Sequence, residues 1–169
     1  MSEIKIVSRP EVKALAISSN VSMWKMPTTM KNNFLNLAAC LKANNADICE
    51  PPFARYSAIE WQSLLSESKL VMFFKSFTKK WLFQTGFPVQ SALSPTNANM
   101  EMITLPAGKY VTALHKGSYM KVGDTYKKMV LWANAQNIAL APESIEVYTS
   151  DPRITAKESL ETQLFIPLA

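Results

Sequence analysis

The chain has 169 residues, of which 48% are hydrophobic and 18% charged, and its formal net charge is +5. These proportions are ordinary for a globular domain and argue against a disordered chain. The apolar runs are far too short to cross a bilayer, and charged residues near the start of the chain argue against a secretory signal. We therefore expect one cytoplasmic domain, residues 1–169, that binds no membrane.

The positive charge is spread over small lysine groups such as Lys79–Lys80 and Lys127–Lys128. This dispersal is typical of a solvated surface, so we expect no direct contact with nucleic acid. Cys40 lies in an apolar helical stretch, which predicts a reduced core thiol. With His115 as the one histidine and no cysteine pair at ligand spacing, we expect no metal site and no cofactor.

Along the chain, the first expected element is a strand over Ile4–Ser18, with β-compatible residues toward its end. A helix follows, in which Pro27 suits the first turn and Thr28 is the expected N-cap. Its apolar residues recur at spacings of four, three and four, which places them on one face. These residues are Met30, Phe34, Leu37 and Leu41.

Extended segments are expected next at Phe53–Tyr56 and Trp81–Val89. Between them, residues 57–80 fit either helix or strand, because their apolar residues follow neither period clearly. The ambiguous apolar residues are Trp61, Leu64, Leu65, Leu70, Val71, Phe73 and Phe74. The loop-like composition of Ser94–Asn99 marks the boundary between two halves, about 1–95 and 100–169.

The second half begins with a strand pair over Met102–His115, broken by a turn at Pro106–Gly108. His115 is expected to end this pair near the surface. An amphipathic helix around Tyr126–Ala133 follows. The last expected strands are Ile145–Thr149 and Leu164–Ile166.

The two halves repeat one order of elements: strand, helix, proline break and a strand that ends in Tyr56 or Tyr148. Such a repeat predicts an α+β fold of two strand-helix-strand-strand units related by a pseudo-two-fold axis. The antiparallel sheets of the two units would then surround a central cleft that can hold a ligand.

Several short motifs resemble the gyrase-inhibitor-like small-molecule-binding family, also known as the AraC-type effector-binding domain. In the second half the motifs are Leu105–Tyr110 (LPAGKY), His115–Tyr119 (HKGSY), Tyr126, Trp132, Pro142, Glu146–Tyr148 (EVY), Asp151–Pro152 and Thr162–Leu168 (TQLFIPL). In the first half they are Pro52–Tyr56 (PFARY) and Gly86–Val89 (GFPV). Together these motifs span nearly the whole chain, and the resemblance rests on their order and spacing.

The resemblance implies the duplicated architecture and an aromatic cleft that accepts amphipathic, often planar and cationic, compounds. Many family members are sensors in transcription regulators that carry a DNA-binding module. At this length we expect a stand-alone member, whose partners would be a separate DNA-binding regulator or gyrase. Other stand-alone relatives hydrolyse reactive alkylating natural products, which leaves catalysis open as an alternative.

Glu146 lies in the strand Ile145–Tyr148, where period-two alternation places it on the same face as Tyr148. A carboxylate on a half-buried strand face is costly without a partner, and a ligand cation stacked on aromatic rings would provide one. Alternatively, Glu146 faces water or pairs with a lysine. The resemblance, which places an acidic residue here in the pocket, favours the first interpretation.

Gln84 and Gln163 are neutral amides at positions where the family often has acids, which argues against a hydrolase because a general base must titrate. We expect both to orient a ligand by hydrogen bonds. Aromatic side chains would form the walls of the cleft, although any one of them can instead belong to the core. The aromatic candidates are Phe53, Tyr56, Trp61, Trp81, Phe87, Tyr110, Tyr119, Tyr126, Trp132, Tyr148 and Phe165.

The sequence thus predicts a non-catalytic binder of amphipathic aromatic cations that acts as a sensor or by sequestration. A hydrolase that uses Glu146 with a bound water, and a protein-interaction module, are the alternatives.

Overall fold

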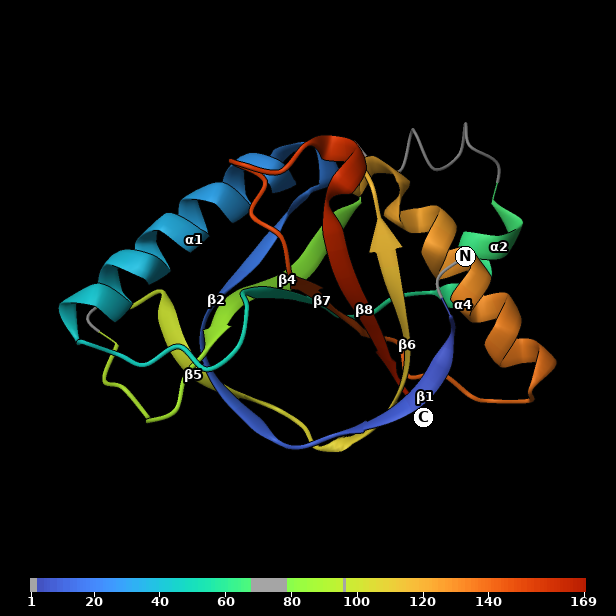
Figure 1. Ribbon diagram of the computed structural model, residues 1–169, viewed down its shortest axis with the longest axis horizontal. Coiled ribbons are helices and arrows are strands. Elements are labelled where there is room, and N and C mark those ends of the chain that lie inside the picture. Colours follow the sequence, from blue (N-terminus) through green and yellow to red (C-terminus); the bar gives the residue numbers. More distant parts are fainter. Residues whose placement is uncertain (1–2, 68–78, 96) are drawn as a thin grey trace.

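The computed structural model, shown in Figure 1, describes residues 3–67, 79–95 and 97–169. Its eight strands form one antiparallel sheet in the order β1-β6-β8-β7-β3-β4-β2-β5. The strands are β1 (Lys5–Arg9), β2 (Val12–Ser22), β3 (Phe53–Tyr56), β4 (Lys80–Pro88), β5 (Met100–Leu105), β6 (Gly108–Lys116), β7 (Ser144–Tyr148) and β8 (Glu161–Pro167). The predicted α+β class is confirmed, and the two units share this single continuous sheet.

Three α-helices and three short 3-10 turns complete the described elements. They are α1 (Met26–Ala43), α2 (Trp61–Ser66), α4 (Val122–Ala135), η1 (Met23–Lys25), η2 (Tyr119–Lys121) and η3 (Lys157–Ser159). In Figure 1, α1 and α4 lie to either side of the central strands. No helix in the described residues is long and apolar enough to span a membrane.

The duplication is visible in the strand order. From the centre outward, the first half runs β3-β4-β2 and the second half runs β7-β8-β6. Where β3 and β7 pair, Ala54 lies opposite Glu146. The predicted pseudo-two-fold axis therefore passes through the sheet between these two residues.

The outermost strands are exchanged between the halves. In the chain, β1 precedes β2 but pairs with β6, and β5 precedes β6 but pairs with β2. The prediction of one strand over Ile4–Ser18 was therefore wrong: the chain breaks at Pro10 and Glu11, between β1 and β2. Proline fixes φ and removes a donor from the ladder, which suits this break.

Both long helices lie where the apolar periodicity predicted them. Pro27 is in the first turn of α1, as expected, but the N-cap is Lys25 and Thr28 lies inside the helix. The prediction that Thr28 caps the helix was wrong; the neighbouring Thr29 hydroxyl donates to the Lys25 carbonyl oxygen at 3.0 Å. The predicted face of α4 is confirmed, because Tyr126, Met129, Val130 and Ala133 are all buried.

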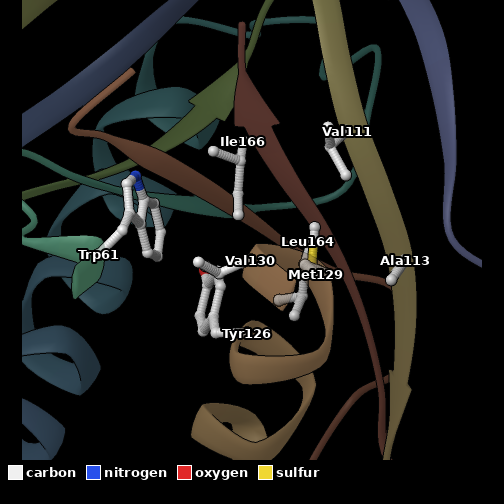
Figure 2. Close-up of a cluster of buried hydrophobic side chains, with 8 residues drawn as sticks. All are labelled: Trp61, Val111, Ala113, Tyr126, Met129, Val130, Leu164 and Ile166. Atoms are coloured by element: carbon white, nitrogen blue, oxygen red, sulfur yellow. The ribbon is translucent and has the colours of Figure 1, made fainter. Parts of the chain in front are cut away.

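The two helices cover one face of the sheet, which we call the helix face. Figure 2 shows the cluster beneath α4: Trp61, Val111, Ala113, Tyr126, Met129, Val130, Leu164 and Ile166. A second cluster beneath α1 includes Leu37 and Cys40, which confirms that this thiol is buried. On the opposite face, a third cluster gathers side chains from β2, β3, β5, β6 and β7, so the sheet curls around that face.

Part of the ambiguous segment 57–80 is helical. In α2, Trp61 packs against Tyr126 with ring centroids 5.6 Å apart, and its Nε1 donates to the Ala141 carbonyl oxygen at 2.7 Å. Leu70, Val71, Phe73 and Phe74, which fitted helix or strand, lie outside the described residues.

Candidate functional site

Glu146 lies at the centre of the sheet and faces the helices. On β7 the alternation of side chains places Ser144, Glu146 and Tyr148 on the helix face and Ile145 and Val147 on the opposite face. The side chain of Glu146 is buried, with only 7% of the residue exposed. Because its equivalent across the axis is an alanine, the site holds one carboxyl and not a facing pair.

Both carboxylate oxygens of Glu146 accept hydrogen bonds from tyrosines. The Tyr126 hydroxyl lies 3.1 Å from Oε1, and the Tyr148 hydroxyl lies 3.0 Å from Oε2. Tyr126 is also 3.0 Å from the Ser144 hydroxyl, from which it can accept while it donates to Glu146. Within the described part of the chain, no lysine or arginine forms a salt bridge with this carboxylate.

Burial raises the pKa of the Glu146 carboxyl from 4.5 to about 7, although the hydrogen bonds from Tyr148 and Tyr126 act in the opposite direction. Burial and then the charge of Glu146 raise the pKa of Tyr126. The carboxyl therefore exists in both protonation states near neutral pH. A cation placed beside it would favour the charged form.

Aromatic rings pack edge to face around Tyr148. Its ring centroid is 5.6 Å from that of Tyr119 in η2 and 6.1 Å from that of Phe34 in α1. Phe34 in turn contacts Phe87 of β4 at 5.7 Å. The predicted residues Tyr119, Phe87 and Tyr148 are thus brought together, with Phe34 added by the helix.

Tyr56 approaches the carboxyl from β3. It lies on the helix face, packs against Phe83 at 5.9 Å and has its hydroxyl 3.9 Å from the Met30 sulfur. Burial and then the charge of Glu146 raise the pKa of Tyr56. Trp61 joins the same group through Tyr126. Tyr56 and Trp61 therefore belong to the aromatic surroundings of the carboxyl.

Other predicted site residues point to the opposite face, away from Glu146. On β3 and β8, Phe53 and Phe165 alternate with residues of the helix face and pack in the third cluster. The Phe165 ring already has a cation over it, since the Arg9 guanidinium lies 4.2 Å from its centroid. The structure does not bring these two rings together with the carboxyl.

The two amides also lie on the opposite face. Gln84 donates to the Ser18 hydroxyl at 3.2 Å, and Gln163 donates to the Thr112 hydroxyl at 2.6 Å. Trp81 shares the helix face, but it lies four positions along β4 from Thr85, the residue in line with Ala54 and Glu146. Sequence motifs alone do not reveal which face a strand residue occupies.

Phe34 was missing from the predicted site, and Tyr126 was an aromatic candidate that had not been linked to Glu146. Tyr126 and Phe34 occupy buried faces of α4 and α1, and the apolar spacing of each helix had placed them toward the sheet. A buried tyrosine hydroxyl needs a polar partner, which is the signal that could have linked Tyr126 to Glu146. The prediction that His115 lies near the surface was wrong, because only 5% of it is exposed.

A cavity of about 540 Å³ lies elsewhere, between α1, β2 and the start of β5. Its polar lining includes Asn33 and Glu101, and none of the residues around Glu146. Within the described ranges, no group of three or more His, Cys, Asp or Glu side chains is arranged to hold a metal ion.

Solved structures of three similar proteins share this fold. The C-terminal domain of EcmrR superimposes with a TM-score of 0.76 at 15% identity, over 100% of this chain and 98% of that domain. In the EcmrR–DNA complex this chain spans 57% of the EcmrR chain and 99% of its own length, at 15% identity and a TM-score of 0.75.

SAV2435, solved bound to tetraphenylphosphonium, has a TM-score of 0.63 at 12% identity, over 99% of this chain and 94% of that one. A hydrolase from Listeria innocua has a TM-score of 0.65 at 10% identity, over 99% and 92% of the two chains. At these identities the likeness concerns the fold alone. No curated protein matches the sequence.

The duplicated sheet and the structural relatives agree with a match to a family model. The model of the GyrI-like small molecule binding domain matches residues 73–169, more than half of the chain. The chain therefore belongs to the GyrI-like small-molecule-binding domain family.

Proposed function

We propose that this chain binds amphipathic aromatic cations at Glu146 and acts as a sensor or by sequestering them. One observation carries the proposal: a buried carboxyl has two tyrosine donors, aromatic neighbours and no salt bridge to a described residue. An aromatic cation would balance the buried charge and stack on the rings.

Glu146 would supply the charge, and Tyr148, Tyr119 and Phe34 would contact the aromatic part of the ligand. Tyr56, Trp61 and Phe87 would complete the walls. Phe53, Phe165, Gln84, Gln163 and Trp81 are left out, because they lie on the opposite face or far along β4.

Two relatives support the ligand class and the role. SAV2435 binds tetraphenylphosphonium, a cation with four aromatic rings, and EcmrR forms a complex with DNA. By analogy, a sensor built on this chain would act through a separate DNA-binding regulator, with gyrase as another partner. These assignments are proposals, since the likeness to both proteins is one of fold.

The test is isothermal titration of tetraphenylphosphonium into wild type and Glu146→Gln at pH 7.5. Removing the charge should weaken binding at least about tenfold, since losing one member of a buried charge pair is costly. Glu101→Gln is the control, because Glu101 is exposed and faces the opposite side of the sheet. Equal affinities of wild type and Glu146→Gln, or no binding by wild type, would overturn the proposal.

Hydrolysis is a second candidate, favoured by the pKa of about 7 for Glu146. A carboxylate with this pKa is suited to accept a proton from water as the water attacks a carbon of an epoxide. The ring C–O bond then breaks, and the ring oxygen takes the proton back from Glu146 to give a diol. The test is product analysis by mass spectrometry after incubation with a panel of epoxides. Turnover that Glu146→Gln abolishes would support hydrolysis, and no turnover by wild type would reject it for this class.

A further inference from the structure

The turn η2 supplies one of the aromatic rings that surround the Glu146 carboxyl. Met120, at its tip, is 93% exposed, Tyr119 is 37% exposed, and Glu146 is 7% exposed. Tyr119 contacts Tyr148, whose hydroxyl donates to Glu146. Burial, followed by the charges of Glu146 and Asp151, raises the pKa of Tyr119, so this ring is within electrostatic reach of the site.

The two elements that pack aromatic rings against Tyr148 differ in how many buried residues they contain. Phe34 belongs to α1, an eighteen-residue helix with four buried residues packed on the sheet. Tyr119 belongs to a three-residue turn that contains no buried residue. Segments with few buried contacts open at low free-energy cost, so η2 is the element that can move.

His115 links this turn to α4 by two hydrogen bonds. Its Nε2 lies 3.1 Å from the carbonyl oxygen of Ser118, the residue that caps η2, and its Nδ1 lies 2.8 Å from the Thr125 hydroxyl in α4. A carbonyl oxygen can only accept, so Nε2 carries a proton, and in the neutral imidazole Nδ1 accepts from the Thr125 hydroxyl. Between His115 and Ser118, Gly117 has φ of +118°, a conformation that suits glycine.

The equivalent turn of the first half is built differently. There, η1 repeats the pattern of η2, with Ser22-Met23-Trp24-Lys25 in place of Ser118-Tyr119-Met120-Lys121. The position that matches His115 is Ser19, whose hydroxyl accepts from Asn33 in the body of α1 at 3.0 Å. Among the described contacts, only the second half has a side chain of the preceding strand, His115, that hydrogen-bonds to the N-cap residue of the turn, Ser118.

We propose that His115 is a positioning residue that latches the Tyr119 turn over the site, and that a ligand reaches Glu146 when this turn moves. The proposal rests on the proposed function, because it concerns access to the same carboxyl. Weakening the latch lowers the free-energy barrier to opening the turn. This barrier is the same for a ligand that enters the site and for one that leaves it. Association and dissociation should therefore accelerate together, while the dissociation constant changes little.

The experiment measures association and dissociation of rhodamine 6G, an aromatic cation, by stopped-flow fluorescence. His115→Asn places its amide where Nδ1 was, so it can still pair with Thr125 but no longer reaches Ser118. His115→Gln is the matched control, because its longer side chain brings an amide N–H to the position of Nε2. Both replace the ring at one buried position, so loss of packing affects both alike.

We expect both rate constants of His115→Asn to rise about fivefold, the effect of losing a hydrogen bond worth ~1 kcal/mol, with Kd within about twofold of wild type. His115→Gln should keep rates near wild type. Tyr119→Ala, at a partly exposed position, is a second variant should the histidine variants fail to fold, and it should also speed association.

The outcomes separate the two proposals. If wild type does not bind rhodamine 6G, the proposed function fails. If wild type binds and the Asn and Gln variants accelerate equally, packing and not the bond to Ser118 sets the rate, and the latch is rejected. Wild-type rates in His115→Asn, or in Tyr119→Ala where the histidine variants do not fold, would reject it too.

Discussion

At the scale of single residues, burial of the Glu146 carboxyl lowers the stability of the folded protein when the carboxyl is charged. A carboxyl in an apolar setting favours its neutral form, and two tyrosine hydroxyls offset only part of that preference. Groups with such strongly shifted pKa values cluster at functional sites. The free energy of unfolding of the unliganded protein should therefore show a pH dependence that comes from this one side chain.

The expected pH dependence is a fall in the free energy of unfolding as the pH rises. The folded-state pKa of about 7 lies above the unfolded value of 4.5, so between these values the folded state binds the extra proton. The free energy of unfolding should drop by about 3 kcal/mol from pH 4.5 to above 7, relative to Glu146→Gln, which cannot titrate. Urea unfolding of both proteins across this range measures the difference. Parallel profiles would show that Glu146 is not buried as described.

The alternation of residues predicted which face of the sheet Glu146 occupies, whereas the motifs did not predict the face of the two amides. Alternation along one short strand was enough to place Glu146 and Tyr148 on the same face. Gln84 and Gln163 were placed in the site by position in a motif, and a motif does not state the side of the sheet. Strand register decides that side, and register depends on pairing partners far apart in the chain.

At the scale of elements, the Phe53 side chain from β3 and the Leu15 backbone from β2 leave no room for a side chain at Gly86 in β4. A Cβ added there would lie 2.6 Å from the Phe53 ring and 2.8 Å from the Leu15 carbonyl oxygen. The helices were easier to predict from sequence than this contact, because a period near 3.6 is local whereas the need for glycine arises from two other strands. The break between β1 and β2 was missed for the same reason: both segments look extended, and only their partners differ.

Gly86→Ala should destabilise the fold by about 1–3 kcal/mol, because the inserted methyl group forces Phe53 or the backbone to shift. Gly123→Ala in α4 is the control, since nothing lies within 4 Å of its added Cβ. Alanine also has the higher helix propensity, by up to about 1 kcal/mol, so this variant should be as stable as wild type or more so. Urea unfolding compares the three proteins, and equal stability of Gly86→Ala and wild type would contradict the described contact.

At the scale of the whole molecule, the halves are repeats but not independent domains. The sequence repeat predicted the axis, whereas the exchange of β1 and β5 left no local signal. Each half receives its edge strand from the other, and β3 pairs with β7 across the centre. Neither half can complete its sheet alone.

A fragment of residues 100–169 should therefore lack cooperative unfolding, whereas fragments 1–95 and 100–169 produced together should associate and regain it. Circular dichroism during urea unfolding distinguishes the two preparations. A cooperative transition in the isolated fragment would show that the exchange of strands is not needed for folding.

The proposed function requires that a ligand cation pair with the charged form of Glu146. Its most direct test is calorimetric titration of tetraphenylphosphonium at about pH 6.5 in two buffers of different ionisation enthalpy, which counts the protons released on binding. With a pKa of about 7 the free site is mostly protonated, so binding should release roughly three quarters of a proton from wild type and none from Glu146→Gln. Binding without proton release from wild type would contradict the proposed function.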